Sequence, residues 1–367
     1  MHCCARARPE RGGENMRWMS LCLVALAALG VTDSAAAQGK RFDGVTLRVG
    51  TWGGTNRDAQ KETAAVELEK LGAKVDYVIG SPQDNFAKII AARGRDVPMD
   101  TFEILGSMLP EVLGRNALDE LNYANIPNAS ALRSDERRKH VVAHWTTQEM
   151  IFYNADKFKE LGLTPPKTLT DLRDRRLAGR IMIPDITSGG GIEGLGGFAL
   201  AAGGDERNVE PGLKLIKEID ALKFWKVGAD VITGFKSGDI WVAVAHAGWA
   251  IRTAYAGVPV VTVPPQYGQK RGLVKEGFLG VVRGTKVKEA AEFYVNTLLS
   301  EDVQYHMSIK TGQIAVNPKV FPRLATVPVV KDLTVLDSDK IANMVRLDPD
   351  KINLSQWIDQ WNRMISR

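Results

Sequence analysis

The fold is decided by the stretch Val45-Thr46-Leu47-Arg48-Val49-Gly50, a β-branched run that ends in glycine and predicts a strand. A rough apolar face predicts a helix over 56–71, which Gly72 ends. Further along, we expect strands over 74–79 and 99–104, with helices over 84–93 and 108–115. This βαβαβα order is typical of a parallel sheet that is covered by helices.

A second unit of the same kind follows the extended region 140–154. We expect strands over 180–184, 240–244, 258–263 and 277–282. Helices are expected over 169–177, 192–202, 210–222, 249–256 and 288–300. The tail predicts proline-rich extended chain and a terminal helix over 354–365. The whole chain therefore belongs to the α/β class.

The first 37 residues have the order of a secretory signal peptide. A basic start at Met16-Arg17-Trp18 precedes an apolar run over 21–30, and Ser34-Ala35-Ala36-Ala37 supplies the small-residue end. We expect cleavage after Ala37, with Met16 as a second candidate start and a buried N-terminal helix as the alternative. Cleavage removes all three cysteines and leaves 330 residues for the exported, periplasmic protein.

The composition excludes several classes of function. With 44% apolar and 25% charged residues, the chain is an ordinary globular protein, long enough for two domains. The net charge of +5 is spread along the chain, and the basic clusters at 133–140 and 173–180 are interrupted by acids, so a nucleic-acid partner is not expected. No segment after the leader predicts a membrane span. We expect no thiolate metal site, because the mature chain has no cysteine. We also expect no cofactor.

Four stretches carry a resemblance to a known family. They are Thr51-Trp52-Gly53-Gly54, the extended segment 143–154, the pair 169–172 and 177–181, and the run 235–239 that leads into Ala247-Gly248-Trp249. In order and spacing they resemble the periplasmic solute-binding proteins of bacterial ABC importers, and most closely the branch that includes the spermidine/putrescine-binding proteins. The resemblance covers nearly the whole mature chain.

The resemblance implies a two-lobed periplasmic binding protein fold of type II. Each lobe would be a mixed, mostly parallel sheet flanked by helices, and hinge strands would join the lobes. Lobe one would comprise residues 38–146 and 275–320, and lobe two would comprise 147–274 and 321–367. The ligand would lie in the cleft between them, where the carboxyl ends of the strands meet.

The candidate ligand-binding residues follow from this placement. Indoles offer flat faces to an alkyl chain or an ammonium, and glycines admit close approach of a ligand to the backbone; the candidates of this kind are Trp52, Gly53, Gly54, Trp145 and Trp249. Acidic candidates for an amine are Glu103, Asp185 and Glu276, the last because the polyamine binders place a carboxylate there. If Glu276 binds an ammonium, Glu276→Gln should weaken a cationic solute about tenfold or more. Each position has a structural alternative, as a core tryptophan, a strand-end turn or a loop acid.

The second lobe departs from the polyamine binders. His246 stands where they have a stacking aromatic residue, and Ser188, Gly189 and Gly190, with Gly191, replace their second acidic pair. These residues open a helix, whose first N–H groups suit an anion. We therefore expect a small amine-bearing solute, polyamine-like or zwitterionic. An aminophosphonate, a thiamine-like cation and an organic anion remain alternative ligands.

Other motifs receive less support. The glycines at 189, 191 and 194 match the dinucleotide pattern G-x-G-x-x-G, but they do not open the first βα unit of the chain. His140 and His144 would lie about 13 Å apart on a strand, and no adjacent tyrosines indicate iron. The sequence thus predicts a receptor without catalysis, a monomer whose partners are a small-molecule solute and an ABC permease of the inner membrane. An exported enzyme on the same scaffold and the ligand module of a sensor are the alternatives.

Overall fold

The computed structural model describes residues 40–92 and 95–365, so the expected signal peptide lies outside the described residues. Within them, one mixed sheet of nine strands has the order β2-β1-β3-β11-β4-β7-β5-β6, with β8 paired to β4. A separate hairpin consists of β9 (Gln266–Tyr267) and β10 (Lys270–Arg271).

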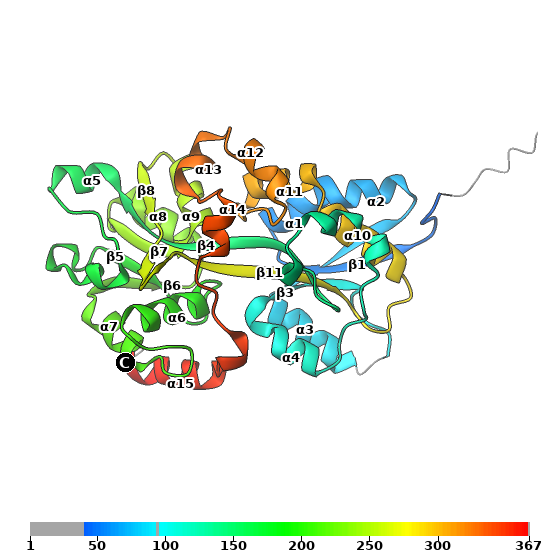
Figure 1. The fold of residues 1–367 in the computed structure, drawn as a ribbon, viewed down its shortest axis with the longest axis horizontal. Coiled ribbons are helices and arrows are strands. Elements are labelled where there is room, and N and C mark those ends of the chain that lie inside the picture. The colour runs from blue at the N-terminus through cyan, green and yellow to red at the C-terminus, as the bar shows by residue number, and fades with distance from the viewer. Residues whose placement is uncertain (1–39, 93–94, 366–367) are drawn as a thin grey trace, which may run out of the picture. The chain divides into compact units, whose positions relative to one another are not determined.

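The first half of the sheet contains three parallel strands, β1 (Thr46–Thr51), β2 (Lys74–Ile79) and β3 (Thr101–Leu105). Helices cover both of its faces, with α3 and α4 on one side and α2 and α10 on the other (Figure 1). The helices of this half are α1 (Thr55–Gln60), a π-helical turn (Lys61–Ala65), α2 (Val66–Lys70), α3 (Pro82–Ala92), α4 (Leu109–Gly114), α10 (Lys288–Leu298) and α11 (Glu301–Thr311).

The second half is built around β5 (Ile181–Pro184), β6 (Ala221–Trp225), β7 (Val242–His246) and β8 (Val260–Val263). β5 pairs in parallel with both β6 and β7. Its helices are α5 (Ala155–Glu160), α6 (Gly191–Ala201), α7 (Glu210–Glu218), α8 (Ala229–Ser237), α9 (Ala247–Tyr255), α12 (Phe321–Leu324), α13 (Pro328–Leu333), α14 (Ser338–Ala342) and α15 (Leu354–Met364).

Two long antiparallel strands join the halves. β4 (Val142–Asn154) pairs with β11 (Leu273–Val281) from Val142 to Glu149, and then with β7 from Glu149 to Tyr153. β11 in turn pairs with β3 only from Gly277 onward. Between the halves the sheet is therefore a two-stranded ribbon, a place where strands can bend.

The buried side chains form separate cores in the two halves. The core of the first half contains residues from Phe42 to Trp145 and from Phe278 to Val316. In the second half, alternate residues of β4, β5 and β7 face opposite sides of the sheet, so Ile151 and Phe152 belong to different cores. Ala315 and Val320, which the sequence assigns to lobe one, belong to a core of the second half, and the expected lobe boundaries stay a prediction.

The expected βα order is present, and several elements differ from expectation. The helix expected over 210–222 ends at Glu218, because Ala221–Trp225 pair with β5 and form β6. The helix expected over 169–177 is two 3₁₀ turns, since the Asp174 carboxylate accepts the backbone N–H of Arg176 and starts a second turn. The tail expected to be extended contains α12, α13 and α14. The terminal helix is present as expected.

Candidate functional site

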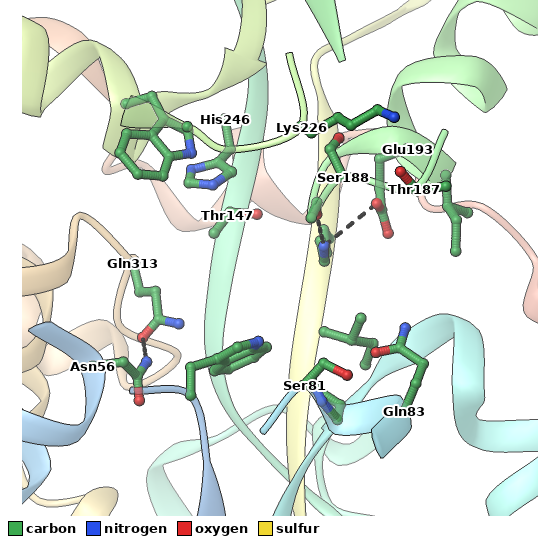
Figure 2. A pocket seen from close by; sticks show the side chains of 18 of the residues that line it. Asn56, Ser81, Gln83, Thr147, Thr187, Ser188, Glu193, Lys226, His246 and Gln313 are labelled. Carbon is green, nitrogen blue, oxygen red and sulfur yellow. Dashed lines mark hydrogen bonds and ion pairs between the residues drawn. The ribbon is translucent and has the colours of Figure 1, made fainter. Parts of the chain in front are cut away.

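A cavity of about 630 Å³ lies where the two halves of the sheet face each other. Polar side chains of the first half (Asn56, Ser81, Gln83) and of the second (Thr187, Ser188, Glu193, Lys226, His246) border it from opposite sides (Figure 2). Its lining includes residues at or shortly after the ends of β1, β5, β6 and β7, namely Trp52, Ile186, Lys226 and His246, as expected when parallel strands end at one edge. The ribbon contributes Trp145, Thr147 and Lys275.

Two indoles form the wall in the first half. The ring centroids of Trp52 and Trp145 are 5.9 Å apart with a tilt of 52°. A Cβ at Gly277 would overlap the Trp145 ring, so this glycine gives the indole room on the ribbon. The indole N–H of Trp145 donates to Glu103 Oε2 at 3.1 Å, which fixes the rotation of the ring.

Glu103 is buried behind this wall and is not in the cavity lining. His144 Nε2 lies 2.5 Å from Glu103 Oε2, and Gln60 Nε2 donates to Glu103 Oε1 at 3.0 Å. With Trp145, these contacts occupy both carboxylate oxygens. Glu103 therefore holds the indole in place and has no free oxygen pointing into the cleft.

The wall in the second half comes from α9 and the residue before it. The His246 and Trp249 rings are 5.8 Å apart, and the Arg252 guanidinium lies 4.4 Å from the centroid of Trp249. A Cβ at Gly228 would overlap the Trp249 indole, which repeats the arrangement of Trp145 on Gly277. Arg252 Nη2 also donates to the Thr311 carbonyl at 2.6 Å.

The glycine loop 185–191 has a defined internal structure. Asp185 Oδ1 accepts the backbone N–H of Thr187 at 2.9 Å and its hydroxyl at 2.6 Å, so Asp185 caps the loop and is not in the lining. A Cβ at Gly191 would collide with the backbone of residues 185–186, and Gly190 lies against the Trp225 ring. Ser188 and Gly189 remain exposed to the cavity.

A buried polar cluster lies beneath the loop. Lys275 Nζ donates to the Gly189 carbonyl and lies 3.5 Å from Glu193 Oε2. Both carboxyl oxygens of Glu149 are buried without a partner in the described structure, and burial, aided by repulsion from Glu193, raises the Glu149 pKa to about 8. Burial also lowers the His246 pKa to about 3, and the charges of Lys275 and Arg252 act in the same direction.

The structure brings seven of the twelve sequence candidates into the lining. These are Trp52, Gly53, Trp145, Ser188, Gly189, His246 and Trp249. The lining does not include Gly54, Glu103, Asp185, Gly190 or Glu276. Glu276 Oε1 instead accepts from Arg346 Nε at 3.0 Å, in an ion pair with both side chains mostly buried.

The lining also contains residues that sequence reasoning missed. β11 begins at Leu273 rather than at Gly277, and successive side chains of a strand point to opposite faces. Lys275 therefore reaches the cleft and Glu276 does not. Thr147 could have been found in the same way, from the alternation of side chains along the ribbon. Arg252 and Gln313 could not, because only tertiary packing brings α9 and the residues after α11 to the cavity.

In the part of the chain that the structure describes, no three His, Cys, Asp or Glu residues are grouped so that they could hold a metal ion. No helix of the described residues is long and apolar enough to cross a membrane.

Comparison with known proteins identifies the family. Residues 25–334 match the model of the family described as bacterial extracellular solute-binding protein. The chain belongs to this family. Secretion or a periplasmic location is the rule for such proteins, and their role is to bind solutes. No curated protein matches the chain.

Solved structures of solute-binding proteins share the fold. An ABC transporter structure from Clostridium perfringens has a TM-score of 0.70 at 23% identity, with 87% of this chain and 99% of that chain covered. The Atu4243-GABA receptor has a TM-score of 0.71 at 21% identity, with 87% of this chain and 96% of that chain covered. AgtB from A. tumefaciens R10, in complex with agropinic acid, has a TM-score of 0.63 at 18% identity, with 88% of this chain and 96% of that chain covered. These similarities confirm the expected periplasmic binding protein fold.

Proposed function

We propose that this solute-binding protein is the periplasmic substrate-binding component of an ABC importer. It captures a small organic solute in the cavity between the halves and delivers it to a membrane permease. The observation that carries the proposal is the cavity itself, which has an indole wall from each half and a two-stranded ribbon behind it. A solute that contacts both walls stabilises the form in which the halves are close.

Additional support comes from the family and from the fold. The family is one of extracellular solute-binding proteins, and one of the similar structures is titled an ABC transporter. The signal-peptide pattern of the first 37 residues agrees with export.

Two of the three carboxylates expected to bind an amine have other partners in the structure. Glu103 is bound to His144 and Trp145, and Glu276 is paired with Arg346, so neither is placed to receive a polyamine. Among the described residues, Glu193 is the one carboxylate in the lining, and it already contacts Lys275. We therefore favour the zwitterionic form of that expectation, or an organic anion, over a polyamine.

The test of this function is solute binding that depends on the cleft. In a thermal-shift screen of amino acids, organic acids, polyamines and sugars, at least one solute should raise the melting temperature, because it binds only the folded state. Trp145→Ala should weaken that solute at least about tenfold, since the indole supplies much of one wall. Trp241→Ala is a matched control, because Trp241 lies under Arg180 and is not in the lining.

The bound solute should be recovered unchanged after denaturation of the protein, as import requires. Conversion of the solute into a product would instead favour an enzyme on the same scaffold. If no solute stabilises the protein, or if Trp145→Ala binds as well as the unaltered chain, the proposed function is wrong.

A further inference from the structure

The charges that face the cavity are unequal. Among the described residues of the lining, three side chains are basic and of the lysine or arginine type (Lys226, Arg252 and Lys275), and one is acidic (Glu193). Lys275 and Glu193 lie 3.5 Å apart and largely neutralise each other. Among the described residues, no carboxylate is within ion-pair distance of Lys226 or Arg252. The cleft therefore has an excess of positive charge.

Arg252 is the better placed of the two remaining cations. Its guanidinium is held over the Trp249 ring and is anchored by one donated hydrogen bond to the Thr311 carbonyl. That bond uses one of the five N–H groups of the guanidinium. A planar cation that is fixed at the edge of an aromatic wall is suited to receive a carboxylate.

Three helices of at least nine residues add to the positive potential, because they begin at the cavity. Gln83 in the first turn of α3, Ile192 in the first turn of α6 and Trp249 in the first turn of α9 all line it. The first N–H groups of a helix carry partial positive charge and attract anions. Neither α6 nor α9 has a side-chain cap that uses these groups.

Independent evidence for a ligand site comes from unpartnered polar atoms in the lining. Thr147 is 5% exposed and lines the cavity, yet its hydroxyl has no hydrogen-bond partner in the described structure. His246 Nδ1 is also buried without a partner. Buried polar atoms are nearly always hydrogen-bonded in folded proteins, so the Thr147 hydroxyl is positioned for a group that a ligand brings.

We propose that the solute is a small organic carboxylate whose anionic group is bound by Arg252 of the second half and by the Thr147 hydroxyl of the ribbon, while its apolar part lies against the indoles of Trp52 and Trp145. This assignment rests on the proposed function and names the substrate class of the same cleft. An ammonium elsewhere on the solute is compatible with it, near Glu193. A solute whose only charges are positive is not compatible with the assignment.

A matched set of four-carbon solutes tests the class directly. Succinate has two carboxylates, 4-aminobutyrate has one carboxylate and one ammonium, and putrescine has two ammoniums. The thermal-shift screen should include these three, their longer homologues, cyclic acids and amines, and spermidine. Every solute that stabilises the protein should contain a carboxylate, and the diamines should have no effect.

Variants of Arg252 then test whether this residue binds the carboxylate. For the strongest carboxylate of the screen, Arg252→Ala should weaken binding about tenfold or more, and Arg252→Lys should retain part of the affinity. Arg180→Ala is the matched control, because Arg180 also stacks over an indole, Trp241, and donates to a backbone carbonyl, that of Asp239, away from the cleft. Calorimetric titration gives the affinities, and a melting curve without solute confirms that each variant folds.

The outcomes separate the two proposals. Stabilisation by diamines or neutral solutes alone, or an Arg252→Ala affinity equal to that of the Arg180→Ala control, would overturn the carboxylate assignment and leave solute binding intact. A panel in which no solute of any class binds would count against the proposed function itself.

Discussion

Replacing the buried carboxyl of Glu149 should remove a pH dependence of stability that the structure places in this one side chain. Glu149 lies on the ribbon strand β4 and is 3% exposed, with both carboxyl oxygens unpartnered. Burial is the main cause that raises its pKa from 4.5 to about 8, and Lys275 opposes the shift only in part. At neutral pH the folded protein therefore holds a proton that the unfolded chain has released.

The sign follows from proton linkage. Between the unfolded pKa of 4.5 and the folded pKa of about 8, the folded state binds more protons, so the free energy of unfolding falls as the pH rises. His246 acts in the opposite direction, because its pKa is lowered from 6.5 to about 3, and its contribution rises with pH over that range. At pH 6.5 the unfolded His246 is half protonated, and above that pH its contribution levels off, whereas the effect of Glu149 continues to about pH 8.

The size of the loss in unfolding free energy follows from the pH interval between 6.5 and 8. From pH 6.5 to 8 the loss is about 1.5 pH units at about 1.36 kcal/mol per unit, or roughly 2 kcal/mol. For a chain of this length that corresponds to a fall in melting temperature of about 3 °C, on an unfolding entropy of about 2 cal/mol/K per residue. Glu149→Gln keeps the shape of the side chain and cannot titrate, so this part of the slope should vanish.

Urea unfolding, followed by tryptophan fluorescence at pH 6.5, 7.0, 7.5 and 8.0, measures the effect. The quantity of interest is the difference between the unaltered protein and Glu149→Gln, because the other titrating groups cancel in it. Glu111→Gln serves as the control, since Glu111 is exposed. The reasoning is refuted if Glu149→Gln keeps the slope of the unaltered protein, or if Glu111→Gln loses the same amount.

Two further predictions concern Gly277, which lies against the Trp145 indole, and Glu276, which pairs with Arg346 outside the cavity. Gly277→Ala should lower the free energy of unfolding by about 1–3 kcal/mol, because a Cβ there overlaps the Trp145 ring. Thermal unfolding checks this against Gly114→Ala, where the space is open, and equal melting temperatures would contradict it. Glu276→Gln should cost about 1–3 kcal/mol by breaking the mostly buried pair with Arg346, while calorimetry finds solute affinity unchanged. A weaker affinity at unchanged stability would return Glu276 to the binding site.

Local sequence patterns were enough for most of the fold. The β-branched run of β1 and the alternation of β2 are local signals, and they predicted both strands correctly. β6 was missed because Ala221–Trp225 are extended only through their pairing with β5, which lies far away in the sequence. α11 was missed because polar residues such as Gln304 and Ser308 are buried on it, so its sequence has no simple apolar face.

The site was predictable where it coincides with strand ends and was not where it depends on strand register. Trp52 and His246 follow or end strands that the sequence marks clearly, and both line the cavity. Lys275 and Glu276 are neighbours, and only the true start of β11 shows which of them faces the cleft. The environment of Glu103 depends on His144 and Gln60, whose approach no local pattern reveals.

A crystal structure of the protein with the strongest carboxylate of the screen tests the central claim most directly. The account predicts one solute molecule between the Trp145 and Trp249 walls, in contact with both halves, with its carboxylate on Arg252 and the Thr147 hydroxyl. A solute bound outside this cavity, or held by residues of one half alone, would contradict it.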